Sequence, residues 1–211
     1  MTPDRRDFVL RRLHSLSGIV PIGAYLVVHI FLENSFILAG AARFDLVPKF
    51  FATLPGVLLL AVEICFLWGP ILFHGLYGLV RVYNGELDTA VRQDWVGAKL
   101  YSLQRISGVV AFLFIGYHVW STRIAYYLDP QNVEISYAFM HAKMTDPLVF
   151  TAYLVGVLAA VFHFTNGIWT FCVTWGITVG QRAQHAARAL AMLFFVVMYG
   201  TAFAIIMAFR A

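Results

Sequence analysis

Four histidines lie within long apolar stretches of this chain, at regular spacing: His29, His74, His118 and His163. The first two are 45 residues apart, as are the last two, so each member of the first pair is 89 residues from its counterpart. An ionisable side chain at membrane depth is energetically costly and is therefore a functional candidate. A neutral imidazole nitrogen is a good ligand for haem iron and other transition metals. The spacing predicts a two-helix unit that is used twice in the same direction across a membrane.

Five apolar segments are long enough to position these histidines in a bilayer, which takes about 20 mostly apolar residues per helix. They cover residues 13–38, 55–83, 100–127, 147–175 and 186–209. All five are too long and too continuously apolar for the alternating strands of a membrane barrel. The sequence therefore predicts an all-α integral membrane protein, with five transmembrane helices in one domain over residues 1–211.

The composition excludes other classes of protein. Hydrophobic residues make up 61% of the chain and charged residues 12%, against about 45–50% and about 25% in soluble domains. Disorder requires low hydrophobicity, and the two cysteines, Cys65 and Cys172, lie in apolar runs and cannot form a disulfide scaffold. The net charge of +4 comes from basic residues in short segments between apolar runs. This distribution indicates membrane topology, with lipid and not nucleic acid as the surroundings.

The basic residues also predict the orientation, because Lys and Arg concentrate in cytoplasmic loops. Ten of the 15 lie on the side of the N-terminal tail: Arg5, Arg6, Arg11, Arg12, Arg81, Arg92, Lys99, Arg105, Arg182 and Arg188. The other five lie on the opposite side, at Arg43, Lys49, Arg123, Lys143 and Arg210. The N-terminus is therefore predicted to be cytoplasmic.

The depth of each histidine follows from a helical rise of about 1.5 Å per residue. His29 and His118 lie about 24–27 Å from the inner side, in the outer half of the membrane. His74 and His163 lie about 24–28 Å from the outer side, in the inner half. Two imidazoles that face each other at one depth can hold a haem iron from both sides. The first four helices are therefore predicted to form a haem-binding bundle with an inner and an outer haem.

Two alternatives without haem remain. A structural zinc site would require four close ligands, usually including cysteine, whereas these histidines divide between two depths. A transporter with parallel two-helix repeats would show polar breaks near the midplane. The repeat itself is imperfect, since Ser17-Gly18 precedes His29 much as Ser107-Gly108 precedes His118, with a difference of one residue.

Four short stretches of the chain resemble a known family of membrane proteins. They are RRLHSLSG at residues 11–18, YHVWSTR at 117–123, FHFTNGIW at 162–169 and VTWGIT at 173–178. In their residues and in their order along the chain, these stretches are similar to the dihaem cytochrome b subunit of succinate:quinone oxidoreductases. The likeness runs from about Phe8 to Thr178, and the fifth helix is only generically similar.

The resemblance implies two b haems with His29, His74, His118 and His163 as axial ligands. It implies a flavoprotein with FAD and an iron–sulfur protein as partners on the cytoplasmic face of a bacterial membrane. The electron partner would be a quinone, with menaquinone expected. The complex would oxidise succinate or, in reverse, reduce fumarate, at a dicarboxylate site outside this chain. Another dehydrogenase served by a dihaem subunit is the alternative.

Further candidate residues lie at the ends of the predicted helices. Arg12, His14 and Ser17 begin the first helix and Arg105 begins the third, near the expected inner haem. The arginines are expected to pair with haem propionates as well as to anchor the helices, and His14 is a candidate for contact with quinone or the iron–sulfur partner.

Two glutamates lie in or near the outer half of the membrane. Glu63 lies at membrane depth in the second helix, so it either exchanges protons with quinone or is a protonated carboxyl bonded to another helix. Glu33 ends the first helix and is interpreted as a solvated cap. In some relatives that reduce fumarate, a glutamate close before the fourth ligand is linked to proton movement, and here Ala160 and Val161 occupy that place.

Overall fold

The protein is described by a computed structural model that covers residues 3–84 and 96–211, so the predicted inner charge Arg92 lies outside the described residues. Five helices in this part of the chain are long and apolar enough to cross a membrane: Asp4–Ala39, Gly56–Tyr83, Gly97–Leu128, Pro147–Thr174 and Gln181–Arg210. The predicted all-α membrane fold with five spans is confirmed. The first and fifth spans begin earlier than predicted, because their polar first turns continue the helix beyond its apolar part.

Three of the five spans contain wider, π-helical turns. The first span consists of α1 (Pro3–Ser17), η1 (Gly18–Gly23), α2 (Ala24–Val28), η2 (His29–Glu33) and the 3₁₀ segment η3 (Asn34–Ala39). The second consists of α5 (Gly56–Glu63), η4 (Ile64–Trp68) and α6 (Gly69–Tyr83), and the third of α8 (Val96–Val119), η5 (Trp120–Ile124) and α9 (Ala125–Leu128). Pro21 lies in η1, where the missing N–H group removes one helical hydrogen bond.

The fourth and fifth spans are each one α-helix, α11 (Pro147–Thr174) and α12 (Gln181–Arg210). Asp146 caps α11, since its carboxylate accepts hydrogen bonds from the backbone N–H groups of Leu148 and Val149, and Pro147 suits the first helical position. The outer connections contain α3 (Ala41–Phe44), α4 (Leu46–Ala52) and α10 (Tyr137–Met144). Asp45 joins them by accepting a 2.7 Å hydrogen bond from the Tyr137 N–H group.

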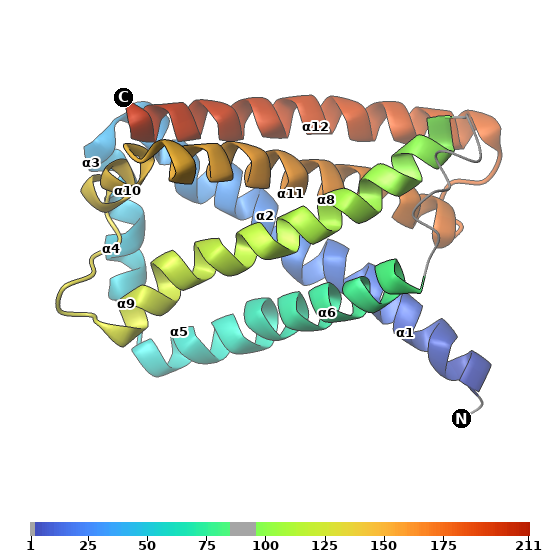
Figure 1. Ribbon diagram of the computed structural model, residues 1–211, viewed down its shortest axis with the longest axis horizontal. Coiled ribbons are helices and arrows are strands. Elements are labelled where there is room, and N and C mark those ends of the chain that lie inside the picture. The colour runs from blue at the N-terminus through green and yellow to red at the C-terminus, as the bar shows by residue number, and fades with distance from the viewer. Residues whose placement is uncertain (1–2, 85–95) are drawn as a thin grey trace.

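The spans form an elongated bundle with the two termini at opposite ends, as an odd number of crossings requires (Figure 1). α11 packs against both α8 and α12, while α6 packs against α1 and α8. A buried core joins α3, α10, α11, α12 and the outer part of the first span: Ile30, Ile37, Phe44, Met140, Met144, Tyr153, Val161, Met198, Ala202, Ile205, Ile206 and Phe209. Large apolar side chains on the outside of the bundle, such as Val57 and Phe66, are exposed as a lipid environment requires.

Candidate functional site

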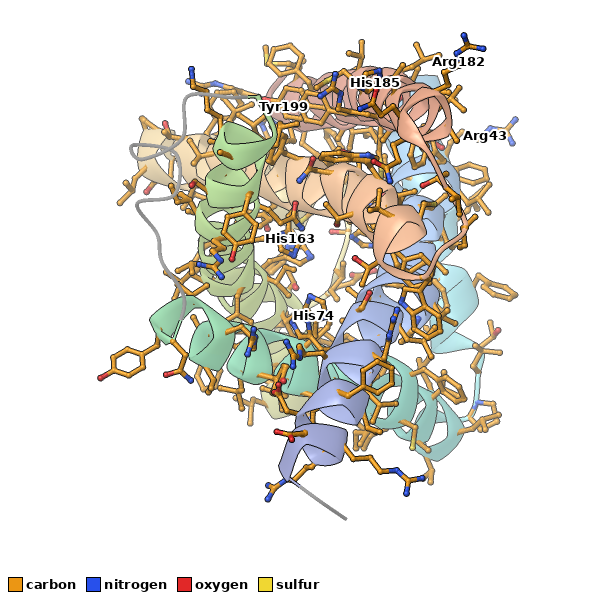
Figure 2. All side chains as sticks on the ribbon, turned by 90° about the vertical axis from the view of Figure 1, so that its right-hand side faces the viewer. Arg43, His74, His163, Arg182, His185 and Tyr199 are labelled. Atoms are coloured by element: carbon orange, nitrogen blue, oxygen red, sulfur yellow. The ribbon has the colours of Figure 1, made fainter. Side chains whose placement is uncertain are left out.

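The inner pair of histidines meets between the second and fourth spans. His74 on α6 and His163 on α11 have ring centroids 6.0 Å apart and ring planes at 85°. Figure 2 shows the two labelled side chains directed toward one another from their separate helices. A metal-bound imidazole nitrogen lies about 2 Å from its ion, so two rings that hold one ion from opposite sides have centroids roughly 6 Å apart. The inner pair has this spacing.

The outer pair meets between the first and third spans with similar geometry. His29 begins η2, and His118 lies on the last turn of α8. Their ring centroids are 5.9 Å apart, with planes at 69°. The structure therefore brings together the same two pairs that the depth calculation predicts.

Backbone carbonyl groups hold the second ring nitrogen of each inner histidine. His74 Nδ1 lies 2.9 Å from the carbonyl oxygen of His14, and His163 Nδ1 lies 2.9 Å from that of Gln104. A carbonyl oxygen only accepts hydrogen bonds, so each Nδ1 carries the proton and each Nε2 keeps its lone pair. Histidines that bind metals characteristically donate their other ring N–H group in this way.

Side chains hold the second ring nitrogen of each outer histidine. His29 Nδ1 lies 2.7 Å from Glu33 Oε2, and His118 Nδ1 lies 3.0 Å from the Tyr153 hydroxyl. Within residues 3–84 and 96–211, none of the four Nε2 atoms has a hydrogen bond to a protein group. His29, His74 and His163 are therefore fixed with Nε2 available as a ligand, while the Tyr153 hydroxyl at His118 Nδ1 can either accept or donate.

Two glycines leave the space that the inner histidines occupy. A Cβ atom at Gly18 would lie 2.5 Å from His74 Cε1, and a Cβ atom at Gly108 would lie 2.7 Å from His163 Cε1. In both cases the carbonyl group that holds Nδ1 belongs to the residue four positions before the glycine. The two halves of the chain therefore build the inner pair in the same way.

His14 and Ser17 contact the inner pair from the first span. The His14 ring stacks on His74 with centroids 4.1 Å apart and planes at 9°. Ser17 Oγ donates to the His14 carbonyl oxygen and lies 3.3 Å from His74 Nδ1. His14 Nε2 is buried and has no hydrogen-bond partner in the described part of the chain. An orphaned polar atom of this kind fits a polar group that the protein itself does not supply.

The two arginines expected at the inner side have different surroundings. Arg12 Nη1 donates a 2.7 Å hydrogen bond to the carbonyl oxygen of Thr174, at the C-terminal end of α11, and its guanidinium lies over Trp175. Arg12 therefore ties the first span to the end of the fourth. The Arg105 guanidinium lies over the Tyr101 ring, 4.2 Å from its centroid.

Glu63 is buried in an ion pair at the outer side of the bundle. It is 8% exposed, and its Oε1 atom accepts a 2.8 Å hydrogen bond from Arg123 Nε. The Tyr127 hydroxyl donates to Oε2 at 3.1 Å. Both carboxylate oxygens are thus occupied by groups from the third span, where Arg123 was predicted only as a charge that marks membrane topology.

Three site residues were missed or misinterpreted. The interpretation of Glu33 as a solvated cap was wrong, because its side chain is 16% exposed and bonded to His29. The spacing of four residues between them was a usable signal. Gln104 bonds to His163 through its backbone and side chain and accepts from Asn166, while Tyr153 is too distant from His118 in sequence to give a local signal.

The zinc alternative receives no support in the part of the chain that the structure describes. No group of three His, Cys, Asp or Glu residues there is close enough to hold a metal ion. Cys65 and Cys172 are unbonded and lie on different spans. The structure instead brings the four histidines together as two pairs of imidazoles.

The chain is similar to known membrane proteins over most of its length. Residues 87–204 match the family described as succinate dehydrogenase/fumarate reductase transmembrane subunit. A curated relative, the succinate dehydrogenase cytochrome b558 subunit of Bacillus subtilis, is 36% identical over 193 residues, which cover 92% of each chain.

Proposed function

Because the chain belongs to the family of succinate dehydrogenase and fumarate reductase transmembrane subunits, we propose that it binds two b haems and passes electrons between an iron–sulfur partner and membrane quinone. The chain is a multi-pass protein of the bacterial cytoplasmic membrane and the membrane anchor of its complex. The proposal adds a flavoprotein with FAD and an iron–sulfur protein on the cytoplasmic face. It leaves open whether the complex oxidises succinate or reduces fumarate.

The observation that carries this proposal is the pair of facing imidazoles at each of two depths. His74 and His163 would hold the inner haem, and His29 and His118 the outer haem. The fixed Nδ1–H groups of His29, His74 and His163 support this assignment, since they leave Nε2 as the ligand atom. A haem supplies a one-electron carrier whose potential the protein sets. Two imidazoles on one iron leave no open position, so this chain would transfer electrons without activating oxygen.

The inner end of the bundle offers partners for the anionic propionate groups. His14 Nε2, which is buried without a partner among the described residues, would donate to one of them. Arg12 and Arg105 would provide positive charge there. The bond from Arg12 to Thr174 supports a second role for this arginine in anchoring the helices.

An apolar groove next to the outer pair suits a lipid-soluble quinone. It measures about 350 Å³ and is lined by Val28, Leu32, Glu33, Phe36, Leu46, Val47, Phe50 and Phe51. Two of the lining residues, Leu32 and Phe50, are each 61% exposed, so the groove opens toward lipid. Glu33 provides the polar group at its wall and also contacts His29. In this proposal Glu63 has a structural role in its ion pair with Arg123, and proton exchange with quinone is the alternative.

A reduced-minus-oxidised absorption spectrum of the purified complex tests the proposal, together with the ratio of haem to protein. We expect b-type bands and two haems for each chain. Changing His74 or His163 should remove the inner haem, while changing His29 or His118 should remove the outer one. A haem-free transporter would show no such bands, and co-purification of a different dehydrogenase would replace succinate dehydrogenase as the partner.

A further inference from the structure

The two proposed haem sites differ in the groups that hold their ligands. At the inner pair, both Nδ1 atoms face peptide carbonyl groups, which are neutral. At the outer pair, His29 faces the carboxylate of Glu33, and His118 faces the Tyr153 hydroxyl. Among the residues that the structure describes, only the outer pair therefore has a ligand bonded to a carboxyl side chain.

Glu33 is held against His29 by its position in the helix. Both residues lie in the π-helical turn η2 (His29–Glu33), and the Nδ1–Oε2 distance is 2.7 Å. The Tyr25 hydroxyl lies 3.2 Å from the same Nδ1 atom. The imidazole N–H group donates to the carboxyl oxygen, since a carboxylate oxygen only accepts.

Little solvent reaches this contact to weaken it. The Glu33 side chain is 16% exposed and lies at the wall of an apolar groove. Charges act more strongly in such surroundings than in water. A carboxylate bonded to the N–H group of an imidazole raises the basicity of the other ring nitrogen.

We propose that Glu33 is a positioning residue that makes His29 a stronger ligand and thereby lowers the midpoint potential of the outer haem. A more basic axial ligand stabilises ferric over ferrous iron, and hydrogen bonding around the ligands is one of the means by which proteins set haem potentials. This inference rests on the proposed function, since it requires a haem between His29 and His118.

Glu33→Gln separates the charge from the hydrogen bond, because the amide oxygen still accepts from His29. In a potentiometric titration of the purified complex, we expect this variant to raise the midpoint potential of one haem and leave the other unchanged. A tenfold change in the ratio of oxidised to reduced haem at fixed potential corresponds to about 59 mV, which is the size of shift expected.

Two further variants identify the haem and control for charge. Tyr153→Phe removes the hydroxyl that contacts His118 Nδ1 and should shift the potential of the same haem by a smaller amount. Glu134→Gln removes an exposed carboxylate from an outer connection and should leave both potentials unchanged. If both potentials stay unchanged in Glu33→Gln, or if Glu134→Gln gives the same shift, the inference is overturned.

If Glu33→Gln loses the outer haem, the potential of that haem cannot be measured in this variant. Glu33→Asp, which keeps the charge on a shorter side chain, is then compared with it. Retention of a low-potential outer haem in Glu33→Asp alone would support the role of the charge. Loss of that haem from both variants would contradict it. The wild-type measurement tests the proposed function separately, because fewer than two haems for each chain would refute that function before any variant is compared.

Discussion

Arg123 and Glu63 form an ion pair that joins the third and second spans at the outer side of the bundle, with Arg123 Nη2 2.7 Å from Glu63 Oε1. The residues are 60 positions apart, and the Tyr127 hydroxyl completes the contact with the second carboxylate oxygen. Both partners are largely shielded from solvent, at 23% and 11% side-chain exposure. The pair therefore fixes the position of His118, five residues before Arg123, relative to the second span.

Removing one partner of this pair should destabilise the bundle. Loss of one member of a buried ion pair costs about 3–5 kcal/mol, because the remaining charge is left without its partner. We expect Arg123→Gln to lower the thermal midpoint of the purified complex, followed through the haem absorption band. The double variant Arg123→Gln with Glu63→Gln should recover much of the loss. A single variant as stable as the wild type would show that the pair is not structurally important.

The same variants examine the proton role of Glu63. If Glu63 only pairs with Arg123, then Glu63→Gln should lower stability while quinone turnover keeps its dependence on pH. Turnover is measured at several pH values below the temperature at which the variant unfolds. A pH profile that loses one of its limbs would favour proton exchange by Glu63.

The glycines beside the inner histidines give a prediction about haem content. An alanine at Gly18 or Gly108 would place Cβ against His74 or His163, so either substitution should displace a ligand. Haem content should fall from two to one for each chain, with the outer haem retained. Gly116→Ala is the matched control on α8, since no atom lies within 4 Å of its Cβ position. Full haem content in Gly108→Ala would disagree with the observed packing.

The groove beside Glu33 gives a prediction about quinone binding. Val47→Trp would fill part of the groove, so the KM for quinone should rise several-fold while haem content and potentials stay the same. Val57→Trp is the control, because Val57 is 85% exposed and lies outside the groove. Steady-state turnover with a soluble quinone analogue measures both. Equal KM values in the two variants would place the quinone elsewhere.

The spans and the pairing of the histidines could be predicted because they depend on local properties, namely apolarity and helical rise. The four-residue spacing of His29 and Glu33 indicated their contact, but the direction of the Glu33 side chain depends on the π-helical turn that begins at His29. The bond between His163 and the Gln104 carbonyl group and the pairing of Glu63 with Arg123 join separate helices. Contacts of this kind depend on how helices rotate about their axes, which periodicity alone does not define.

The π-helical turn at Gly18–Gly23 accounts for the unequal lengths of the two repeats. Gly18 lies eleven residues before His29, whereas Gly108 lies ten residues before His118 on an uninterrupted α-helix. A π-helical turn accommodates one additional residue without breaking the helix. The first span can therefore lose one residue at this turn while the helix on either side keeps its orientation. Deleting a single codon within this turn should be far less damaging than the same deletion between Gly108 and His118.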